Sequence, residues 1–233
     1  MLRKLASALH DFSHLFFPHN CLGCGNDILQ NDALLCAKCF EEMPETGFIP
    51  QPGNPVEKIF YGRIQTEHAG SAFYFTKGSL MQQLLIELKY RRNKEAGFYL
   101  GKLLGMELAA SGRFDMVDAI IPLPLNPKKE KKRGYNQALV IAEGINKEWG
   151  KPIIKHAVAR KLFTDTQTKK GRVERLQNME DVFIVKDTPA LENKHILLVD
   201  DVVTTGASLE ACATPMLKIP GTKISIATVA YTI

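Results

Sequence analysis

The chain has 233 residues, of which 45% are hydrophobic and 24% are charged, proportions that are ordinary for a folded soluble protein. This length allows one large domain, or one domain with a small module attached. No apolar run approaches the ~20 residues that a membrane-spanning helix needs, which argues against membrane insertion and makes the cytoplasm the default compartment.

Positive charge is unevenly divided along the chain. Residues 1–60 carry four basic and seven acidic side chains, a net of −3, whereas the remainder carries 26 and 18, a net of +8. Thirteen of the 30 Lys and Arg residues fall in three runs, 89–94, 128–133 and 169–175. Such runs are usually solvated loops, but in a phosphate-handling protein they also bind pyrophosphate or a nucleic-acid backbone.

The first expected element is an amphipathic helix at the N-terminus. Leu2, Leu5, Leu9, Phe12 and Phe16 recur at helical spacing, and the segment lacks the apolar core of a signal peptide. We therefore expect this helix to pack on its own protein.

Four of the five cysteines form two Cys-x-x-Cys pairs, Cys21 with Cys24 and Cys36 with Cys39. Two thiolates two residues apart on a tight turn grip one metal ion, and a second such pair completes a tetrahedron. Disulfides are the competing interpretation, which a reducing compartment disfavours, and a redox Cys-x-x-Cys is usually single. The pattern predicts a structural Zn²⁺ site whose four positions are all filled by sulfur.

A segment rich in proline follows the cysteines. Pro44, Pro50, Pro52, Gly53 and Pro55 are typical of a linker. We expect the domain boundary near residue 58, so that residues 1–58 hold the N-terminal helix and a zinc-ribbon module and residues 59–233 form the main domain.

The main domain alternates expected strands with expected helices. Strands are expected at 69–76, 116–125, 153–158, 183–185, around Ile196 and at 223–231, and helices at 80–89, 95–110, 137–149 and 208–218. Gly97, Gly101 and Gly105 indicate a helix face that packs closely on a neighbour. The alternation predicts an α/β fold with a mostly parallel sheet flanked by helices, and ligands at the carboxyl ends of its strands.

The strand around Ile196 ends in the most specific chemistry of the chain. Asp200 and Asp201 close an apolar run, and the small residues 204–208 then lead into a helix. Backbone N–H groups and hydroxyls of such a loop converge on one point, and the helix N-terminus behind it adds partial positive charge, which suits a phosphate monoester. The two carboxylates can accept hydrogen bonds from sugar hydroxyls or face a hydrated Mg²⁺. These residues point to a ribose with a 5′-phosphate; the alternative is a plain strand-turn-helix with a solvated acidic pair.

The string 199–208 resembles the phosphoribosyl pyrophosphate (PRPP) loop of type I phosphoribosyltransferases. In that family the two acids hold the ribose 2′ and 3′ hydroxyls, and the Thr-Thr-Gly segment wraps the 5′-phosphate. The resemblance assigns to PRPP binding Asp200, Asp201, Val202, Val203, Thr204, Thr205, Gly206, Ala207 and Ser208.

The same family places a pyrophosphate loop and a mobile catalytic loop before the PRPP loop. The segments that match in order are a pyrophosphate loop with Pro122, Leu123, Pro124, Leu125 and Arg133, and a catalytic loop with Lys169, Lys170, Arg172 and Arg175. Together with Asp200 and Asp201, the four basic residues of the second loop are the expected catalytic residues.

A wider set of motifs narrows the resemblance to the ComF family, over nearly the whole chain from about residue 15. In order, these motifs are the two cysteine pairs, Leu88-Lys89-Tyr90, Pro122-Leu123-Pro124-Leu125, Arg133-Gly134-Tyr135-Asn136-Gln137, Thr166-Gln167, Arg175-Leu176-Gln177-Asn178 and the Asp-Asp-Val-Val-Thr-Thr-Gly string. The resemblance implies a type I phosphoribosyltransferase fold over 59–233 with an N-terminal zinc ribbon.

Two functions are implied. The first is an enzyme that uses PRPP and Mg²⁺, transfers phosphoribosyl to an unidentified acceptor and releases pyrophosphate. The second is a non-catalytic accessory protein of DNA uptake that binds PRPP and single-stranded DNA, with DNA-uptake proteins as partners. Exposed Tyr90 and Tyr135 beside a basic groove suit single strands. The four lysines between 128 and 132 cannot all reach one pyrophosphate, which favours binding of these lysines to single-stranded DNA.

Overall fold

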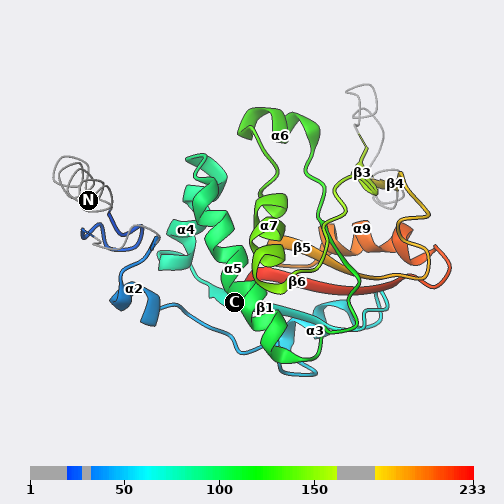
Figure 1. Ribbon diagram of the computed structural model, residues 1–233, viewed down its shortest axis with the longest axis horizontal. Helices are drawn as coiled ribbons and strands as arrows, with labels where there is room; N and C mark the ends of the chain where they lie inside the picture. The colour runs from blue at the N-terminus through cyan, green and yellow to red at the C-terminus, as the bar shows by residue number, and fades with distance from the viewer. Residues whose placement is uncertain (1–19, 28–32, 162–181) are drawn as a thin grey trace, which may run out of the picture.

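The computed structural model describes residues 20–27, 33–161 and 182–233. Its centre is a four-stranded sheet with the order β1-β6-β5-β2 (Figure 1). The strands are β1 (Ala69–Phe75), β2 (Ala119–Pro122), β5 (His195–Val203) and β6 (Lys223–Thr232). Each neighbouring pair is parallel, which confirms the α/β fold predicted from the alternation of elements.

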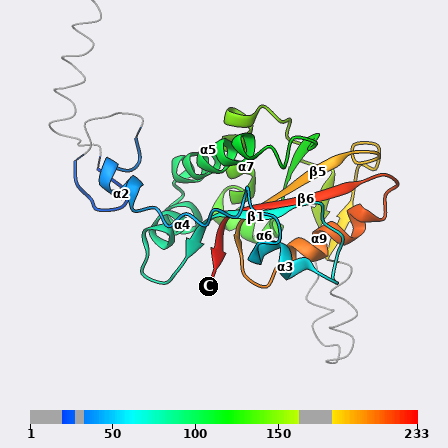
Figure 2. The same cartoon turned by 90° about the horizontal axis from the view of Figure 1, so that it is seen from below.

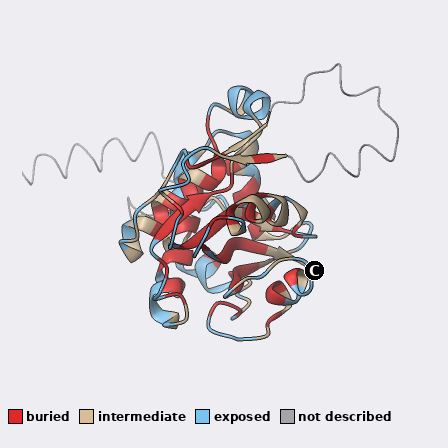
Figure 3. Ribbon diagram, turned by 90° about the vertical axis from the view of Figure 1, so that its right-hand side faces the viewer, coloured by how far each residue is buried: buried red, intermediate tan, exposed pale blue. Residues whose placement is uncertain are grey.

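Helices cover both faces of this sheet. On one face lie α4 (Leu80–Tyr90), α5 (Lys94–Ser111) and α7 (Gln137–Trp149), and on the other α3 (Pro55–Phe60) and α9 (Ala207–Leu217). Strand β5 shows why two separate cores form. Leu197 and Val199 pack with α4, α5 and α7, whereas Ile196 and Leu198 pack with α3 and α9, because side chains alternate along a strand. The buried residues accordingly gather along the sheet and the inner helix faces (Figure 3).

Helices α5 and α7 lie side by side with their backbones in close approach (Figure 2). A Cβ atom at Gly101 would lie 2.2 Å from the carbonyl oxygen of Ile141, and one at Gly144 would lie 2.2 Å from that of Phe98. Neither carbonyl can move without breaking its helix. The close-packing face predicted from the glycine spacing is therefore confirmed, and Gly144 supplies its counterpart on α7.

Two expected strands differ from the observed ones. The strand expected at 116–125 is limited to β2, an edge strand that tolerates Pro122 at its end. The strand expected at 153–158 is wrong: Ile153 makes one parallel bridge to Ile120 at the edge of the sheet. The chain instead forms β3 (Val158–Arg160), which pairs antiparallel with β4 (Phe183–Val185) in a separate two-stranded sheet.

Three short helices lie where the sequence pattern favours loops: α2 (Ala37–Glu41), α3 and α6 (Pro127–Arg133). Helices α3 and α6 begin in the same way. The side chains of Asn54 and Asn126 accept hydrogen bonds from backbone N–H groups of the first turn, and a proline occupies the first helical position. The Asn-Pro pairs are thus helix starts, although at 54–55 the pair lies in a segment whose composition is typical of a linker.

The cysteine-containing segment packs against the main core. Cys21, Cys39 and Met43 lie in the same hydrophobic cluster as Leu84 and Leu88 of α4. The chain then runs along β1, where the N–H of residue 46 donates to the carbonyl of residue 72 at 2.8 Å. The division at residue 58 stays a prediction, and the expected N-terminal helix lies outside the described residues. Within the described ranges, no helix is both long and apolar enough to cross a membrane.

Candidate functional site

The loop between β5 and α9 forms a small cradle at the carboxyl end of the sheet. Gly206 has φ +72° and is the N-cap of α9, so the chain turns sharply from strand to helix there. A cavity of about 90 Å³ opens at this turn, lined by Asp200 and by the loop from Val202 to Leu209. Of the residues assigned to PRPP binding by resemblance, all except Asp201 line this cavity. Backbone N–H groups at a helix start suit a phosphate group.

Helix α3 and the turn after it support the cradle from behind. A Cβ atom at Gly206 would lie 2.7 Å from Cγ2 of Ile59 and 2.8 Å from Cε1 of Phe60. Arg63 donates hydrogen bonds to the carbonyl oxygens of Thr205, at 2.7 Å, and Ile59, at 3.0 Å, and forms an ion pair with Glu210 of α9. The loop is therefore fixed by a segment far away in the sequence, which sequence patterns alone do not reveal.

The two aspartates lie on opposite faces of β5, because consecutive strand residues alternate. Asp200 lines the cradle. Asp201 faces α4, where its Oδ1 atom lies 2.9 Å from Nζ of Lys89. The Asp201 side chain is only 6% exposed, and its Oδ2 atom is buried with no hydrogen-bond partner among the described residues. A ribose-holding role for each acid stays a prediction, but the two carboxylates have different surroundings.

The carboxyl group of Asp200 is partly shielded from water. Burial, and then the negative charge of Asp201, raise the pKa of Asp200 to about 8, while the N–H of Asp201, which donates to Asp200 Oδ1 at 2.8 Å, acts in the opposite direction. A carboxyl group in this position gains most from a ligand that brings hydroxyl donors or positive charge.

A second, strongly basic cavity of about 310 Å³ lies between the end of α4 and α6. Its lining consists of Lys89, Tyr90, Arg92, Lys129, Lys132 and Arg133. Arg133 is the predicted pyrophosphate residue, and its guanidinium donates to Gln137 on α7. Lys89 and Arg92 lie outside the predicted site. The signals that point to them are the basic run 89–94 and, for Lys89, the Leu88-Lys89-Tyr90 motif.

The predicted pyrophosphate segment 122–125 lines neither of these two cavities. It leaves the carboxyl end of β2, where the N–H of Leu123 donates to the carbonyl of Val199 at 2.8 Å. The side chain of Asn136 donates to the carbonyl of Leu123 at 3.0 Å. This segment therefore connects β2 to α6 along a fixed path. The charged residues that line the basic cavity on this side belong to α6.

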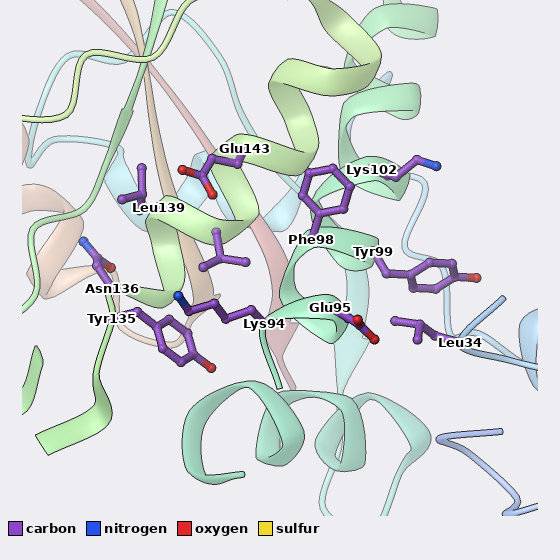
Figure 4. Close-up of a pocket in the computed structure, with 11 residues that line it drawn as sticks. Leu34, Lys94, Glu95, Phe98, Tyr99, Lys102, Tyr135, Asn136, Leu139 and Glu143 are labelled. Atoms are coloured by element: carbon purple, nitrogen blue, oxygen red, sulfur yellow. The ribbon is translucent and has the colours of Figure 1, made fainter. Parts of the chain in front are cut away.

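The two tyrosines predicted to be exposed differ. Tyr90 is 75% exposed at the cavity, as expected. Tyr135 is only 8% exposed, so its predicted exposure is wrong. The Tyr135 hydroxyl donates to the carbonyl of Leu88, and Nζ of Lys94 lies 5.3 Å from the centre of its ring (Figure 4). Tyr135 thus packs the start of α7 against the end of α4, and of these two tyrosines Tyr90 alone presents its ring to solvent.

The larger cavity shown in Figure 4, of about 680 Å³, lies between α5 and α7. Phe98 and Lys102 of α5 face Leu139 and Glu143 of α7 across it. Tyr135 lines this cavity, but none of the residues predicted to bind PRPP, pyrophosphate or metal does. It is separate from the chemistry of the PRPP-like loop.

The predicted catalytic residues Lys169, Lys170, Arg172 and Arg175 lie outside the described residues. The segment that contains them is flanked by β3 and β4, whose residues Arg160 and Phe183 are paired. Val158 and Phe183 belong to the same hydrophobic cluster as Leu209 of α9. Strand β4, which follows this segment, packs beside α9, the helix that begins at the cradle.

The four predicted metal ligands form one cluster. The Sγ atoms of Cys21, Cys24, Cys36 and Cys39 all lie within 4.8 Å of one another. Those of Cys24 and Cys36 are 3.7 Å apart, close to the ~3.8 Å between ligands of a tetrahedral site with Zn–S bonds of about 2.3 Å. A Cβ atom at Gly23 would lie 2.8 Å from Sγ of Cys39, so the tight turn needs glycine.

The surroundings of the thiols suit a metal-bound thiolate. Burial opposes ionisation of Cys21, but N–H groups that include those of Gly23 and Cys36, at 3.4 and 3.3 Å from its sulfur, lower its pKa to about 6. Burial and the neighbouring thiols raise the pKa of Cys39 to about 12. None of the five cysteines is in a disulfide. The cluster can therefore hold a metal ion, which would compete with the protons of the remaining thiols.

Comparison with known proteins agrees with this geometry. Residues 141–232, from α7 to β6, match the phosphoribosyl transferase domain family. The chain is 30% identical to competence protein ComFC of Bacillus subtilis over 149 residues, which cover 62% of this chain and 56% of that protein. It is 26% identical to competence protein F of Haemophilus influenzae over 211 residues, 90% of this chain and 83% of that protein. DNA utilization protein YhgH of Escherichia coli is 28% identical over 145 residues, which cover 59% of this chain and 61% of that protein.

Solved structures give only distant likenesses. A hypothetical protein from Neisseria gonorrhoeae with bound ppGpp aligns with a TM-score of 0.39 and 15% identity, over 73% of this chain and 75% of that one. Hypoxanthine-guanine phosphoribosyl transferase of Leishmania donovani aligns with a TM-score of 0.36 and 20% identity, over 59% of this chain and 67% of that one. At these values the alignments add no argument about function.

The parallel sheet, the strand-to-helix cradle and the family match together define a phosphoribosyl transferase domain protein. Within that class, the chain is similar in sequence to proteins named competence protein ComFC, competence protein F and DNA utilization protein YhgH. Its alignments span only 56% of the ComFC protein and 61% of the YhgH protein.

Proposed function

We propose that the chain binds PRPP and transfers its phosphoribosyl group to an acceptor, with release of pyrophosphate. The observation that carries the proposal is the cradle of about 90 Å³ between β5 and α9, lined by Asp200 and a loop at a helix N-terminus. A phosphate monoester attached to a sugar matches a cradle of N–H groups with a carboxylate beside it.

The reaction is displacement at C1 of the ribose. An acceptor nucleophile forms a bond to C1, and the electron pair of the C1–O bond leaves with pyrophosphate. The loop 204–208 holds the 5′-phosphate, and Asp200 accepts hydrogen bonds from the sugar hydroxyls, which fixes the orientation of C1. Arg133 and the other cations of the basic cavity stabilise the departing diphosphate charge.

Mg²⁺ and Zn²⁺ have different places in this proposal. The carboxylate oxygens of Asp200 are hard donors that suit Mg²⁺ entering with the diphosphate. Bound Mg²⁺ supplies charge neutralisation of the pyrophosphate. Zn²⁺ is the proposed occupant of the four-thiolate cluster, where no position remains for catalysis. Free thiols fit a reducing compartment, so we propose a cytoplasmic location.

The test is calorimetry with PRPP and Mg²⁺, followed by measurement of pyrophosphate release with a library of nucleobases and amines. We expect the wild type to bind PRPP, and Asp200→Asn to bind it about 10-fold or more weakly, because a charge-assisted hydrogen bond is lost. Unchanged affinity in that variant contradicts the assignment of the cradle. Release of pyrophosphate with one acceptor establishes turnover and identifies the acceptor class.

Single-stranded DNA is a second candidate ligand. The observation in its favour is exposed Tyr90 beside five cationic side chains, a combination that offers one stacking surface and a path for phosphates. The names of the relatives, competence protein and DNA utilization protein, point the same way. In this case the chain binds PRPP and a strand without turnover, with DNA-uptake proteins as partners. Strand binding without pyrophosphate release for any acceptor favours this candidate.

A further inference from the structure

Lys89 lies between Asp201 of β5 and the basic cavity. Its ammonium lies 2.9 Å from Oδ1 of Asp201, next to the residue that lines the cradle. The same side chain lines the basic cavity with Arg133 and Lys132 of α6. Lys89 occupies the last turn of α4, whose other face packs into the core through Leu84 and Leu88. Its backbone is therefore fixed, and only the flexible four-carbon stem allows the ammonium to move.

Asp201 is placed to orient Lys89. The carboxylate is nearly buried, whereas the Lys89 side chain is 24% exposed, so the pair runs from the protein interior toward the basic cavity. A buried carboxylate needs a charged partner, and removing that partner leaves an uncompensated charge. Asp200, on the opposite face of β5, has no such contact within the described part of the chain and lines the cradle instead. The two neighbouring acids therefore have separate tasks.

We propose that Lys89 binds the diphosphate group of PRPP and that Asp201 is the positioning residue that aims it into the basic cavity. This inference rests on the proposed binding of PRPP and adds a ligand-contacting residue to it. It also divides the acidic pair, with Asp200 serving the sugar and Asp201 serving Lys89. The chemistry recognised by Lys89 is that of a doubly phosphorylated leaving group, which a sugar monophosphate lacks.

The experiment compares two ligands by calorimetry, PRPP and ribose 5-phosphate, on the full chain with Mg²⁺. In Lys89→Met we expect PRPP affinity to fall about 10- to 100-fold, because a charge-assisted contact is lost, while ribose 5-phosphate affinity changes less than about threefold. Lys89→Arg should restore part of the PRPP affinity, because a cation returns to the cavity. Asp201→Asn should also weaken PRPP more than ribose 5-phosphate, since it acts through Lys89.

Arg91→Gln is the matched control. Arg91 lies two residues from Lys89 and is also cationic, but it pairs with Glu87 on the helix surface and does not line the cavity. We expect its affinities for both ligands to match the wild type. Because Lys89→Met leaves a buried carboxylate unpaired, the double variant Lys89→Met/Asp201→Asn removes both charges and protects the test against misfolding. Its PRPP affinity should be no lower than that of Lys89→Met alone.

Equal losses for both ligands in Lys89→Met overturn the inference, because Lys89 would then support the fold or the sugar. Unchanged PRPP affinity also overturns it and reduces the pair to a structural ion pair. These results leave the proposed function intact when the wild type binds both ligands. A wild type that binds neither ligand overturns the proposed function, and this inference with it.

Discussion

Glycine is required at position 206 of the cradle for two reasons. Its positive φ is costly for residues with a side chain, and the atoms of Ile59 and Phe60 fill the space that a Cβ atom needs. Arg63 also fixes the loop, because it donates a hydrogen bond to the carbonyl of Thr205 on the side away from the cavity. The phosphate loop is thus shaped by contacts on its far side, away from the ligand, and changes there should disturb ligand binding without touching the ligand.

Gly206→Ala should reduce both stability and phosphate binding. The left-handed backbone costs roughly 1–2 kcal/mol for a residue with Cβ, and the contact with α3 adds to that cost. Gly112→Ala is the control, since Gly112 has φ +67° with no atom within 4 Å of its Cβ position. Urea unfolding should show a larger loss for Gly206→Ala, and only this variant should lose affinity for ribose 5-phosphate. Equal losses in both variants contradict the role of the α3 contact.

At the scale of elements, α6 determines which lysines reach the basic cavity. Lys129, Lys132 and Arg133 are three and four residues apart and line it, whereas Lys128 and Lys131 do not. The basic run therefore has two faces, one toward the proposed pyrophosphate position and one away from it. This division follows from helical geometry, and a loop with the same residues would not impose it.

Variants of the lysines on the two faces of α6 distinguish binding of single-stranded DNA from binding of PRPP. In Lys128→Gln/Lys131→Gln we expect PRPP affinity near that of the wild type and a flatter salt dependence of single-stranded DNA binding, by about 0.7 per lost phosphate contact on a log–log plot. Lys129→Gln/Lys132→Gln, the matched pair on the cavity face, should weaken both ligands. The measurements are fluorescence anisotropy with a labelled oligonucleotide at several salt concentrations, and calorimetry with PRPP. Absence of DNA binding at low salt contradicts the second candidate function.

At the scale of the whole molecule, the cysteine cluster and the α/β core share one hydrophobic cluster. Cys21, Cys39 and Met43 pack with residues of α4, and Leu80 of α4 lies beside Gly23. Helix α4 also carries Lys89 at its other end. The metal cluster is therefore linked to the proposed site through one helix, and its loss should be felt beyond the cysteine segment.

Removal of one ligand tests this connection. We expect wild-type protein purified without chelator to contain about one zinc ion per chain, and Cys36→Ser to contain much less, because a four-sulfur site needs every ligand. Hydrogen exchange in that variant should accelerate in residues 20–43 and at the start of α4, and change little in β5 and β6. Cys212→Ala, which removes a buried thiol away from the cluster, should keep its zinc. A metal content near zero in the wild type contradicts the zinc assignment.

Two histidines at the amino ends of the sheet strands make the stability of the protein depend on pH. His195 begins β5, and its Nε2 lies 2.9 Å from the hydroxyl of buried Ser225; His68 precedes β1 nearby. Burial lowers the pKa of both imidazoles below the ordinary value of 6.5. The folded state thus favours the neutral rings, whereas the unfolded chain binds protons from about pH 6.5 downward.

The contribution of these two histidines to stability should therefore fall as the pH drops from about 6.5 through their folded pKa values, whereas the raised pKa of Asp200 acts in the opposite direction. Urea unfolding between roughly pH 5 and 8 checks this, with His195→Gln as the variant in which the fall is smaller. His156→Gln, at an exposed histidine, is the control and should retain the wild-type profile. A profile of His195→Gln equal to that of the wild type contradicts the contribution of His195.

Much of the fold follows from local patterns, whereas the wrong predictions arise from contacts with distant parts of the chain. The positions of α4, α5 and α7 agree with their periodicity, and the glycine spacing on α5 correctly indicates close packing. The segment at 153–158 has strand-like residues but finds only one bridge at the sheet edge, because pairing depends on what lies beside it. Tyr135 looks like an exposed aromatic next to basic residues, yet its hydroxyl finds the carbonyl of Leu88 and the ring becomes buried.

The sequence by itself determined the features whose parts are close together in the chain. The string from Asp200 to Ser208 and each Cys-x-x-Cys pair are such features, because short-range backbone geometry brings their groups together. Only the tertiary structure decided which distant residues complete them. Lys89 meets Asp201 because α4 packs on one face of the sheet, and Arg63 reaches Thr205 across 142 residues because α3 packs on the other. Such contacts depend on which face each element turns toward its neighbour, and that choice is made by the packing of the whole core.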